Sequence, residues 1–96
     1  MIANLPNKIV ERIRIFARER NVAKVILFGS RARGTNGERS DVDIAAVGGD
    51  FGAFYRDVQE RIDSLLSFDV VNLSSSASDE LKQEIERDGV TIYEKV

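Results

Sequence analysis

The sequence predicts a single α/β domain in which a small β-sheet is flanked by helices. Two observations support this fold class. Segments with helical spacing of apolar residues alternate along the chain with short apolar runs rich in β-branched residues. The 96 residues contain no repeat, linker or low-complexity tract, and this length is that of one small domain. We therefore expect one domain over residues 1–96, with no separate substrate-binding module.

The first half of the chain predicts one helix followed by two strands. Apolar residues recur at helical spacing between residues 6 and 20, and Pro6 suits the first turn of that helix. The run "VAKVILFG" predicts a buried strand that ends at Gly29. The segment "RSDVDIAAVGGD" alternates apolar and polar residues before a Gly-Gly turn, which predicts a second strand. Its two aspartates, Asp41 and Asp43, share one face of that strand.

The second half of the chain predicts two further helices and two further strands. The first of these helices has a core-facing pattern formed by Phe51, Phe54, Tyr55, Val58, Ile62, Leu65 and Leu66. The segment "SFDVVNL" predicts a third strand. The polar loop "SSSAS" supplies capping residues for a last helix, which runs to about Asp88 with Gly89 as its C′ residue. The segment "VTIYEK" then predicts a final strand.

Composition limits the chemistry of the chain. No apolar run approaches the length of a membrane span, and the N-terminal "MIANLPNKIVERIRIF" lacks the apolar segment of a signal peptide. We therefore expect a soluble, cytoplasmic protein with no membrane partner. Cysteine and histidine are absent, which excludes disulfides, thiolate zinc sites and cysteine nucleophiles. A general base or metal ligand must then be a carboxylate, a hydroxyl, a lysine, a tyrosine or the backbone.

Charge is distributed unevenly along the chain. Residues 1–39 hold 9 basic and 3 acidic side chains, a balance of +6, whereas residues 40–96 hold 5 basic and 13 acidic, a balance of -8. This asymmetry indicates an anionic ligand near the first half, a basic partner for the second, or only a solvated surface. No basic run with interleaved aromatic residues is present, so we do not expect a long nucleic-acid ligand.

The segment "FGSRARGTNGERSDVDIAAV" contains the residues with the clearest chemical meaning. Gly29 and Gly34 have P-loop spacing, but Thr35 and Asn36 follow where a P-loop needs lysine and a hydroxyl residue, and the dinucleotide-binding pattern is absent. A Gly-Ser turn at the end of a strand remains, followed after ten residues by Asp-x-Asp on the next strand. Each piece alone has a plain structural interpretation, as a turn or as a solvated strand face.

Together these pieces suit nucleoside triphosphate chemistry. Gly29 and Ser30 allow backbone N–H groups and a hydroxyl to approach phosphates closely. Asp41 and Asp43 can hold a pair of magnesium ions, and a third carboxylate is usually needed to complete the metal shell and accept a proton. Asp69 is the candidate, because a carboxylate in an apolar strand is costly if buried without a cation or a hydrogen-bond donor.

The "GSRARG" and "SDVDI" segments, with ten residues between Ser30 and Asp41, resemble the nucleotidyltransferase superfamily that includes DNA polymerase beta. Nearly the whole chain resembles the minimal nucleotidyltransferase (MNT) family of prokaryotes. The resemblance implies a mixed sheet with flanking helices, which some schemes class as α+β. It also implies ATP as nucleotide donor, two Mg²⁺ ions, and a partner of the HEPN type, a helical ribonuclease toxin, in a homo-oligomer or hetero-oligomer.

The resemblance assigns roles to individual positions. Gly29 and Ser30 match the phosphate-binding pair of the family, and Asp41 and Asp43 match its metal-binding pair. Asp69 matches the third carboxylate by strand context.

The remaining polar residues of the motif keep two interpretations each. Arg31, Arg33 and Arg39 neutralise triphosphate charge or lie on the surface, and Arg33 is favoured because the family motif often reads A-R-G there. Ser40 donates a hydrogen bond near the metal site or caps the strand.

Three functions follow as expectations. The first is transfer of AMP from ATP to a tyrosine hydroxyl of a HEPN toxin, which silences the toxin. The second is an antitoxin or scaffold that inhibits its partner by contact without catalysis. The third is nucleotidyl transfer to a small molecule, but the chain lacks the extra domain that encloses such an acceptor in larger relatives.

Overall fold

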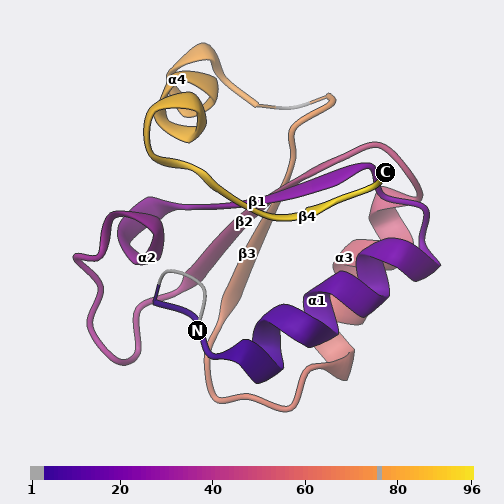
Figure 1. Ribbon diagram of the computed structural model, residues 1–96, viewed down its shortest axis with the longest axis horizontal. Helices are drawn as coiled ribbons and strands as arrows, with labels where there is room; N and C mark the ends of the chain where they lie inside the picture. Colours follow the sequence, from indigo (N-terminus) through magenta and orange to yellow (C-terminus); the bar gives the residue numbers. More distant parts are fainter. Residues whose placement is uncertain (1–3, 76) are drawn as a thin grey trace.

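The computed structural model describes residues 4–75 and 77–96, in which four helices and four strands follow one another along the chain (Figure 1). In order they are α1 (Asn7–Glu19), β1 (Lys24–Phe28), α2 (Gly29–Arg33), β2 (Val42–Val47), α3 (Phe51–Arg61), β3 (Phe68–Asn72), α4 (Asp79–Asp88) and β4 (Val90–Glu94). Residues 1–3, at the start of "MIANLPNKIVERIRIF", and Ser76 of the polar loop "SSSAS" lie outside the described residues. Among residues 4–75 and 77–96, no helix is long and apolar enough to cross a membrane.

The strands form one mixed sheet in the order β3-β2-β1-β4. Strand β1 pairs antiparallel with β2 and with β4, whereas β2 pairs parallel with β3. A parallel pair needs a crossover connection, and α3 supplies it between β2 and β3. The register places Asp43 of β2 between Phe28 of β1 and Asp69 of β3. The predicted fold class, a small sheet flanked by helices, is confirmed.

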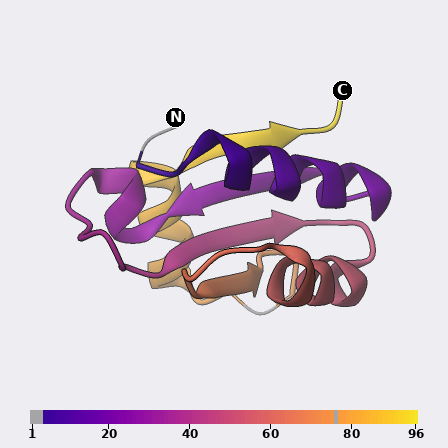
Figure 2. The same cartoon turned by 90° about the horizontal axis from the view of Figure 1, so that it is seen from below.

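The two faces of the sheet are covered unequally. Helices α1 and α3 lie side by side on one face, α1 toward β4 and α3 toward β3 (Figures 1 and 2). The larger core lies beneath them, and its side chains include Phe16, Phe54 and Ile44, which are fully buried. On the opposite face, α4 covers a smaller cluster formed by Ile26, Phe28, Ala45 and Ile85. The second face is therefore covered by a smaller cluster than the first.

Helix α3 is shorter than the apolar pattern predicts. It ends at Arg61, and Ile62 already has extended backbone angles because the chain must turn back to begin β3 beside β2. Leu65 is fully exposed and Tyr55 is 44 % exposed, so the prediction that both belong to the core is wrong. Ile62 and Leu66 do pack against the larger core.

The capping residues of α4 follow the prediction in one case and differ in the other. The Ser78 hydroxyl accepts a hydrogen bond from the Leu81 N–H at 3.2 Å, which is the expected N-cap. Gly89 follows the last residue of α4, but its backbone is extended, with φ of -65°. Glycine suits this position because a Cβ would overlap the Ile85 carbonyl and lie 2.7 Å from a methyl of Ile26.

Candidate active site

Asp43 occupies the centre of the candidate site. The side chains of Val42 and Ile44 point into the larger core, so strand alternation places Asp43 on the α4 face of the sheet. Its side chain is half-buried and has no hydrogen-bond or ion-pair partner among the described residues. Burial raises the pKa of Asp43, and the charges of Asp69, Asp41 and Glu84 raise it further. The site therefore holds a carboxylate that forms no ion pair with a cation among the described residues.

Gly29 brings the predicted phosphate-binding turn against this carboxylate. The turn is the start of the short helix α2, and Gly29 has a φ of +76°, which favours glycine. A Cβ at Gly29 would overlap a carboxylate oxygen of Asp43 and lie 3.2 Å from its Cγ. Only a residue without a side chain allows this approach. The structure thus joins Gly29 and Asp43, which are 14 positions apart in the sequence, in one place.

Ser30 follows Gly29 at the start of α2. It is half-buried, and its hydroxyl makes no hydrogen bond with the residues that the structure describes. The Ser30 carbonyl accepts the N–H groups of Gly34 and Thr35, which closes the short helix. The hydroxyl is therefore free to bind a ligand.

Asp69 lies beside Asp43 in the sheet but is not buried. The two residues are partners in the parallel register of β2 and β3. Asp69 is exposed because β3 is an edge strand and its apolar neighbours turn to the opposite face, where Val70 joins the larger core. Asp69 is not buried, so the cost expected for a buried carboxylate does not arise, and its role as the third carboxylate stays a prediction.

Asp41 is exposed just before β2 begins. Asp41 and Asp69 act on Asp43 through their charge, so the three predicted carboxylates lie near one another. Within residues 4–75 and 77–96, no group of three or more Asp or Glu side chains is close enough together to hold a metal ion in this structure. Carboxylate oxygens are nonetheless the ligands that Mg²⁺ prefers.

Arg31 has a structural role that the sequence did not reveal. It is 4 % exposed, and its guanidinium donates hydrogen bonds to the backbone carbonyls of Asn4, Glu38 and Ser40. These bonds hold the loop between α2 and β2. Arg31 is therefore neither a surface residue nor free to bind phosphate.

Ser40 and Arg39 lie in the same loop. The Ser40 hydroxyl accepts a hydrogen bond from the Gly37 N–H at 2.9 Å, so it closes a turn of the loop in this structure. Arg39 is exposed and forms no ion pair within the described part of the chain.

Arg33, the arginine favoured for phosphate binding, is already paired. Its Nη1 lies 3.1 Å from Oε2 of Glu84, which joins α2 to α4. Sequence reasoning missed Glu84, because nothing in the local pattern of α4 distinguishes it from its acidic neighbours Glu80 and Glu86. Arg33 lowers the pKa of Asp43 and Glu84 raises it, so both charges act on the same site.

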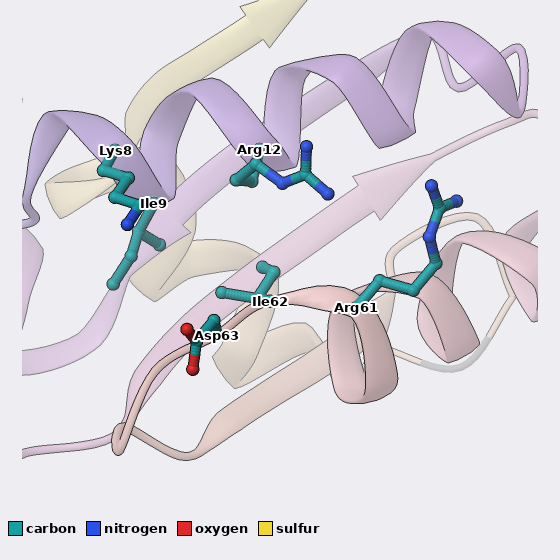
Figure 3. A pocket seen from close by; sticks show the side chains of 6 residues that line it. All are labelled: Lys8, Ile9, Arg12, Arg61, Ile62 and Asp63. Carbon is teal, nitrogen blue, oxygen red and sulfur yellow. The ribbon is translucent and has the colours of Figure 1, made fainter.

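The cavity in Figure 3 is separate from these residues. It has a volume of about 270 Å³ and lies between α1 and the end of α3, lined by Lys8, Ile9, Arg12, Arg61, Ile62 and Asp63. The guanidinium carbons of Arg12 and Arg61 lie 5.0 and 4.8 Å from the centre of the Phe16 ring. This cavity is on the α1 and α3 side of the sheet, away from Asp43.

The chain is similar to known proteins over most of its length. The family model for polymerase beta nucleotidyltransferases matches residues 8–96. A crystal structure of a toxin-antitoxin with AMP-PNP is 27 % identical, with a TM-score of 0.70, over 90 % of this chain and 73 % of that chain. Two mutants of the toxin-antitoxin MntA-HpeT are also similar. One is 25 % identical with a TM-score of 0.70, over 90 % of this chain and 73 % of its own. The other is 26 % identical with a TM-score of 0.63, over 93 % and 72 %.

Curated proteins gave no match. The family model, however, covers nearly the entire sequence, and the solved structures share its fold over most of their length. The chain therefore belongs to the polymerase beta family of nucleotidyltransferases.

Proposed function

We propose that this nucleotidyltransferase is an antitoxin that transfers AMP from ATP to a tyrosine hydroxyl of a HEPN-type toxin. The observation that carries the proposal is the contact between Gly29 and the unpaired, half-buried carboxylate of Asp43. A phosphate-binding turn and a cation-binding carboxylate must adjoin if a metal-bound triphosphate is to occupy both. Among the described residues, no cation or hydrogen-bond donor pairs with the Asp43 carboxylate, so a purely structural role does not explain its place beside Gly29.

The similar structures support the donor and the kind of partner. One is a toxin-antitoxin with AMP-PNP, an analogue of ATP, and the two others are mutants of the toxin-antitoxin MntA-HpeT. The HEPN class of toxin comes from the resemblance to the MNT family. Transfer of AMP adds a phosphate charge and a bulky nucleoside to the toxin, and both can block an active site.

The residues of this chain divide the work of binding ATP. The Ser30 hydroxyl donates to a phosphate oxygen, and Gly29 allows the phosphates to approach the backbone. Asp41, Asp43 and Asp69 would hold Mg²⁺, because all three are hard oxygen donors; Asp43 and Asp69 are partners in neighbouring strands, and Asp41 lies just before β2. Burial, and then repulsion by Asp69 and Asp41, raise the pKa of Asp43, and a divalent cation would offset both effects. When bound, Mg²⁺ supplies Lewis-acid polarisation of the phosphates and neutralises the leaving pyrophosphate.

The transfer itself exchanges one phosphate bond for another. The tyrosine oxygen attacks the α phosphorus, the bond from that phosphorus to the bridging oxygen of pyrophosphate breaks, and pyrophosphate leaves. The proton of the hydroxyl passes to a carboxylate of the site, for which Asp69 is the candidate at the exposed edge of the sheet. Asp41 and Asp69 are both exposed, so a docked toxin is needed to exclude water and align the hydroxyl.

The experiment compares the native protein with the Asp41→Asn, Asp43→Asn double variant. Each is incubated with the separately purified toxin and Mg-ATP, and the ribonuclease activity and intact mass of the toxin are measured. We expect the native protein to add AMP and to silence the toxin, and the double variant to lose at least about 10²-fold in transfer rate. The matched control is Asp63→Asn, an exposed aspartate on the other side of the sheet, which should behave as the native protein.

Inhibition by contact is the alternative outcome. Full protection by the double variant, with no change in the mass of the toxin, would exclude AMP transfer as the means of silencing. Two controls accompany the double variant. Its thermal melting curve shows whether it is folded, and a pull-down shows whether it still binds the toxin.

A further inference from the structure

The ion pair between Arg33 and Glu84 joins α2 to α4, and both of its charges act on Asp43. Arg33 is the last residue of α2, which begins at Gly29 against the Asp43 carboxylate. Ser30 and Arg33 are three positions apart on α2, so their side chains lie on the same side of that helix. A phosphate bound to the Ser30 hydroxyl would thus be within reach of the Arg33 guanidinium.

Glu84 holds that guanidinium from the other side. Its carboxylate extends from α4, and its charge, like that of Arg33, acts on Asp43. The side chains of Arg33 and Glu84 are 41 % and 31 % exposed, so solvent screens the attraction between them. A triphosphate carries several negative charges and can accept two parallel N–H bonds from one arginine. The pair is therefore weak enough for a triphosphate to replace it.

Helix α4 packs on the smaller of the two cores. Ile85 is its only buried residue within the described chain, and the cluster that it joins is the smaller of the two. Helix α1, in contrast, buries five side chains in the larger core. Helix α4 also contacts α2 and β1, and Leu81 packs against the smaller cluster, so loss of the ion pair would remove one side-chain contact between α2 and α4.

We propose that Glu84 is a positioning residue: its ion pair with Arg33, which we call the latch, holds the Arg33 guanidinium away from the nucleotide site. ATP binds when a phosphate replaces Glu84 as the partner of Arg33. This inference rests on the proposed function, because it assumes that the triphosphate occupies the turn at Gly29 and Ser30. Glu84 then lowers the affinity for ATP, and nucleotide binding releases Glu84 from its ion pair with Arg33. Because both side chains of the pair are partly exposed, the surface of the protein at Glu84 would differ between the ATP-bound and the free state.

Calorimetry with Mg-AMP-PNP measures the latch directly. We expect Glu84→Gln to bind this analogue about threefold or more tightly than the native protein, because Arg33 no longer has a competing partner. Arg33→Gln should bind it about fivefold or more weakly, because a guanidinium contact is lost. Glu86→Gln is the matched control, since Glu86 is an exposed acid on the same helix with no ion pair within the described residues.

A double-mutant cycle separates the latch from a general effect of charge. In the Arg33→Gln background, Glu84→Gln should raise the affinity much less than it does in the native protein, by no more than the effect of removing its charge near Asp43. An equal gain from Glu84→Gln with and without Arg33 would overturn the latch, and so would a native affinity in Glu84→Gln. Failure of every variant and of the native protein to bind Mg-AMP-PNP would instead refute the proposed nucleotide site, and the latch with it. A melting temperature close to native confirms that Glu84→Gln is folded.

Discussion

Two aspartates of this small domain, Asp57 and Asp43, have opposite environments. Asp57 on α3 is 5 % exposed and accepts a hydrogen bond from Arg20 Nε at 2.7 Å and one from Arg61 at 3.4 Å. The hydrogen bond from Arg20 holds the pKa of Asp57 below its usual range. Asp43 is half-buried, has no such partner among the described residues, and has a raised pKa. Asp57, which pairs with two arginines, stabilises the fold, whereas Asp43, which has no such partner among the described residues, is available to bind a ligand.

The difference follows from where the cations of the fold lie. Arg20 follows the last residue of α1 and Arg61 ends α3, and helix C-termini attract positive side chains. Both helices cover the same face of the sheet, so their ends meet around Asp57. On the other face, the neighbours of Asp43 are Asp41, Asp69 and the Arg33–Glu84 pair. Acidic residues thus gather on the face that is less covered.

Substitution of Asp57 should have the largest effect on stability. Asp57→Asn removes the charge that Arg20 and Arg61 share, and a hydrogen bond to a charged group contributes about 1.5 to 3 kcal/mol. We expect the free energy of unfolding to fall by about that amount in urea denaturation. Asp63→Asn, which changes an exposed aspartate, should shift it by less than about 0.5 kcal/mol. Equal stabilities of the two variants would show that the Asp57 cluster is not structural.

Gly29→Ala should have the next largest effect. The left-handed backbone at Gly29 costs an alanine about 1 to 2 kcal/mol, and the new Cβ would displace the Asp43 carboxylate. We expect lower stability together with weaker binding of Mg-AMP-PNP.

Gly52→Ala is the control for Gly29→Ala. Gly52 lies in α3, and a Cβ added there would come no closer than 4.0 Å to a neighbouring side chain, so alanine should raise stability by about 0.5 to 1 kcal/mol. Effects of the same sign at both glycines would contradict the close approach of Gly29 to Asp43.

Asp43→Asn should leave stability unchanged or raise it by less than about 0.5 kcal/mol. The substitution removes a charge that burial and three neighbouring carboxylates disfavour. Urea denaturation at neutral pH and low salt tests this. A loss comparable to that of Asp57→Asn would mean that Asp43 has a structural partner in solution.

The changes in unfolding free energy caused by Asp57→Asn and by Asp43→Asn should depend on pH over different ranges. The folded pKa of Asp57 is lowered, so its stabilisation is complete above the unfolded value of about 3.9 and is lost as pH falls through the folded value. The folded pKa of Asp43 is raised, so its penalty is complete above the folded value and fades as pH falls toward about 3.9. The gain of Asp43→Asn should therefore disappear between about pH 7 and pH 4, where the loss of Asp57→Asn stays constant. Unfolding free energies measured across this range would show parallel changes if the two carboxylates were alike.

The parts of the site that could be predicted from sequence are those set by local pattern. The glycine turn at the end of β1 and the alternation along β2 place Gly29 and Asp43 correctly, because each depends on a few adjacent residues. The strand that carries Asp69 was also predicted. Its exposure was not, because whether a strand lies at an edge depends on the order of strands in the sheet.

The parts that could not be predicted depend on contacts between distant segments. Arg31 is buried because it reaches the carbonyls of Asn4 and of the loop before β2. The Arg20–Asp57 and Arg33–Glu84 pairs join different helices, and no local pattern selects one acidic residue over another. The end of α3 at Arg61 is likewise imposed by the return of the chain to β3, against an apolar pattern that continues to Leu66.

The central place of β1 in the sheet has a consequence for the order of folding. Lys24 pairs with Val47 on one side and with Glu94 on the other, so the β1–β2 pair closes a much shorter loop than the β1–β4 pair. We expect β1, α2 and β2 to associate early, and α4 and β4 to dock late, so that substitutions in β4 speed unfolding more than they slow folding. Gly29 and Asp43 then meet before Glu84 arrives, and the domain assembles its phosphate turn first and its latch last.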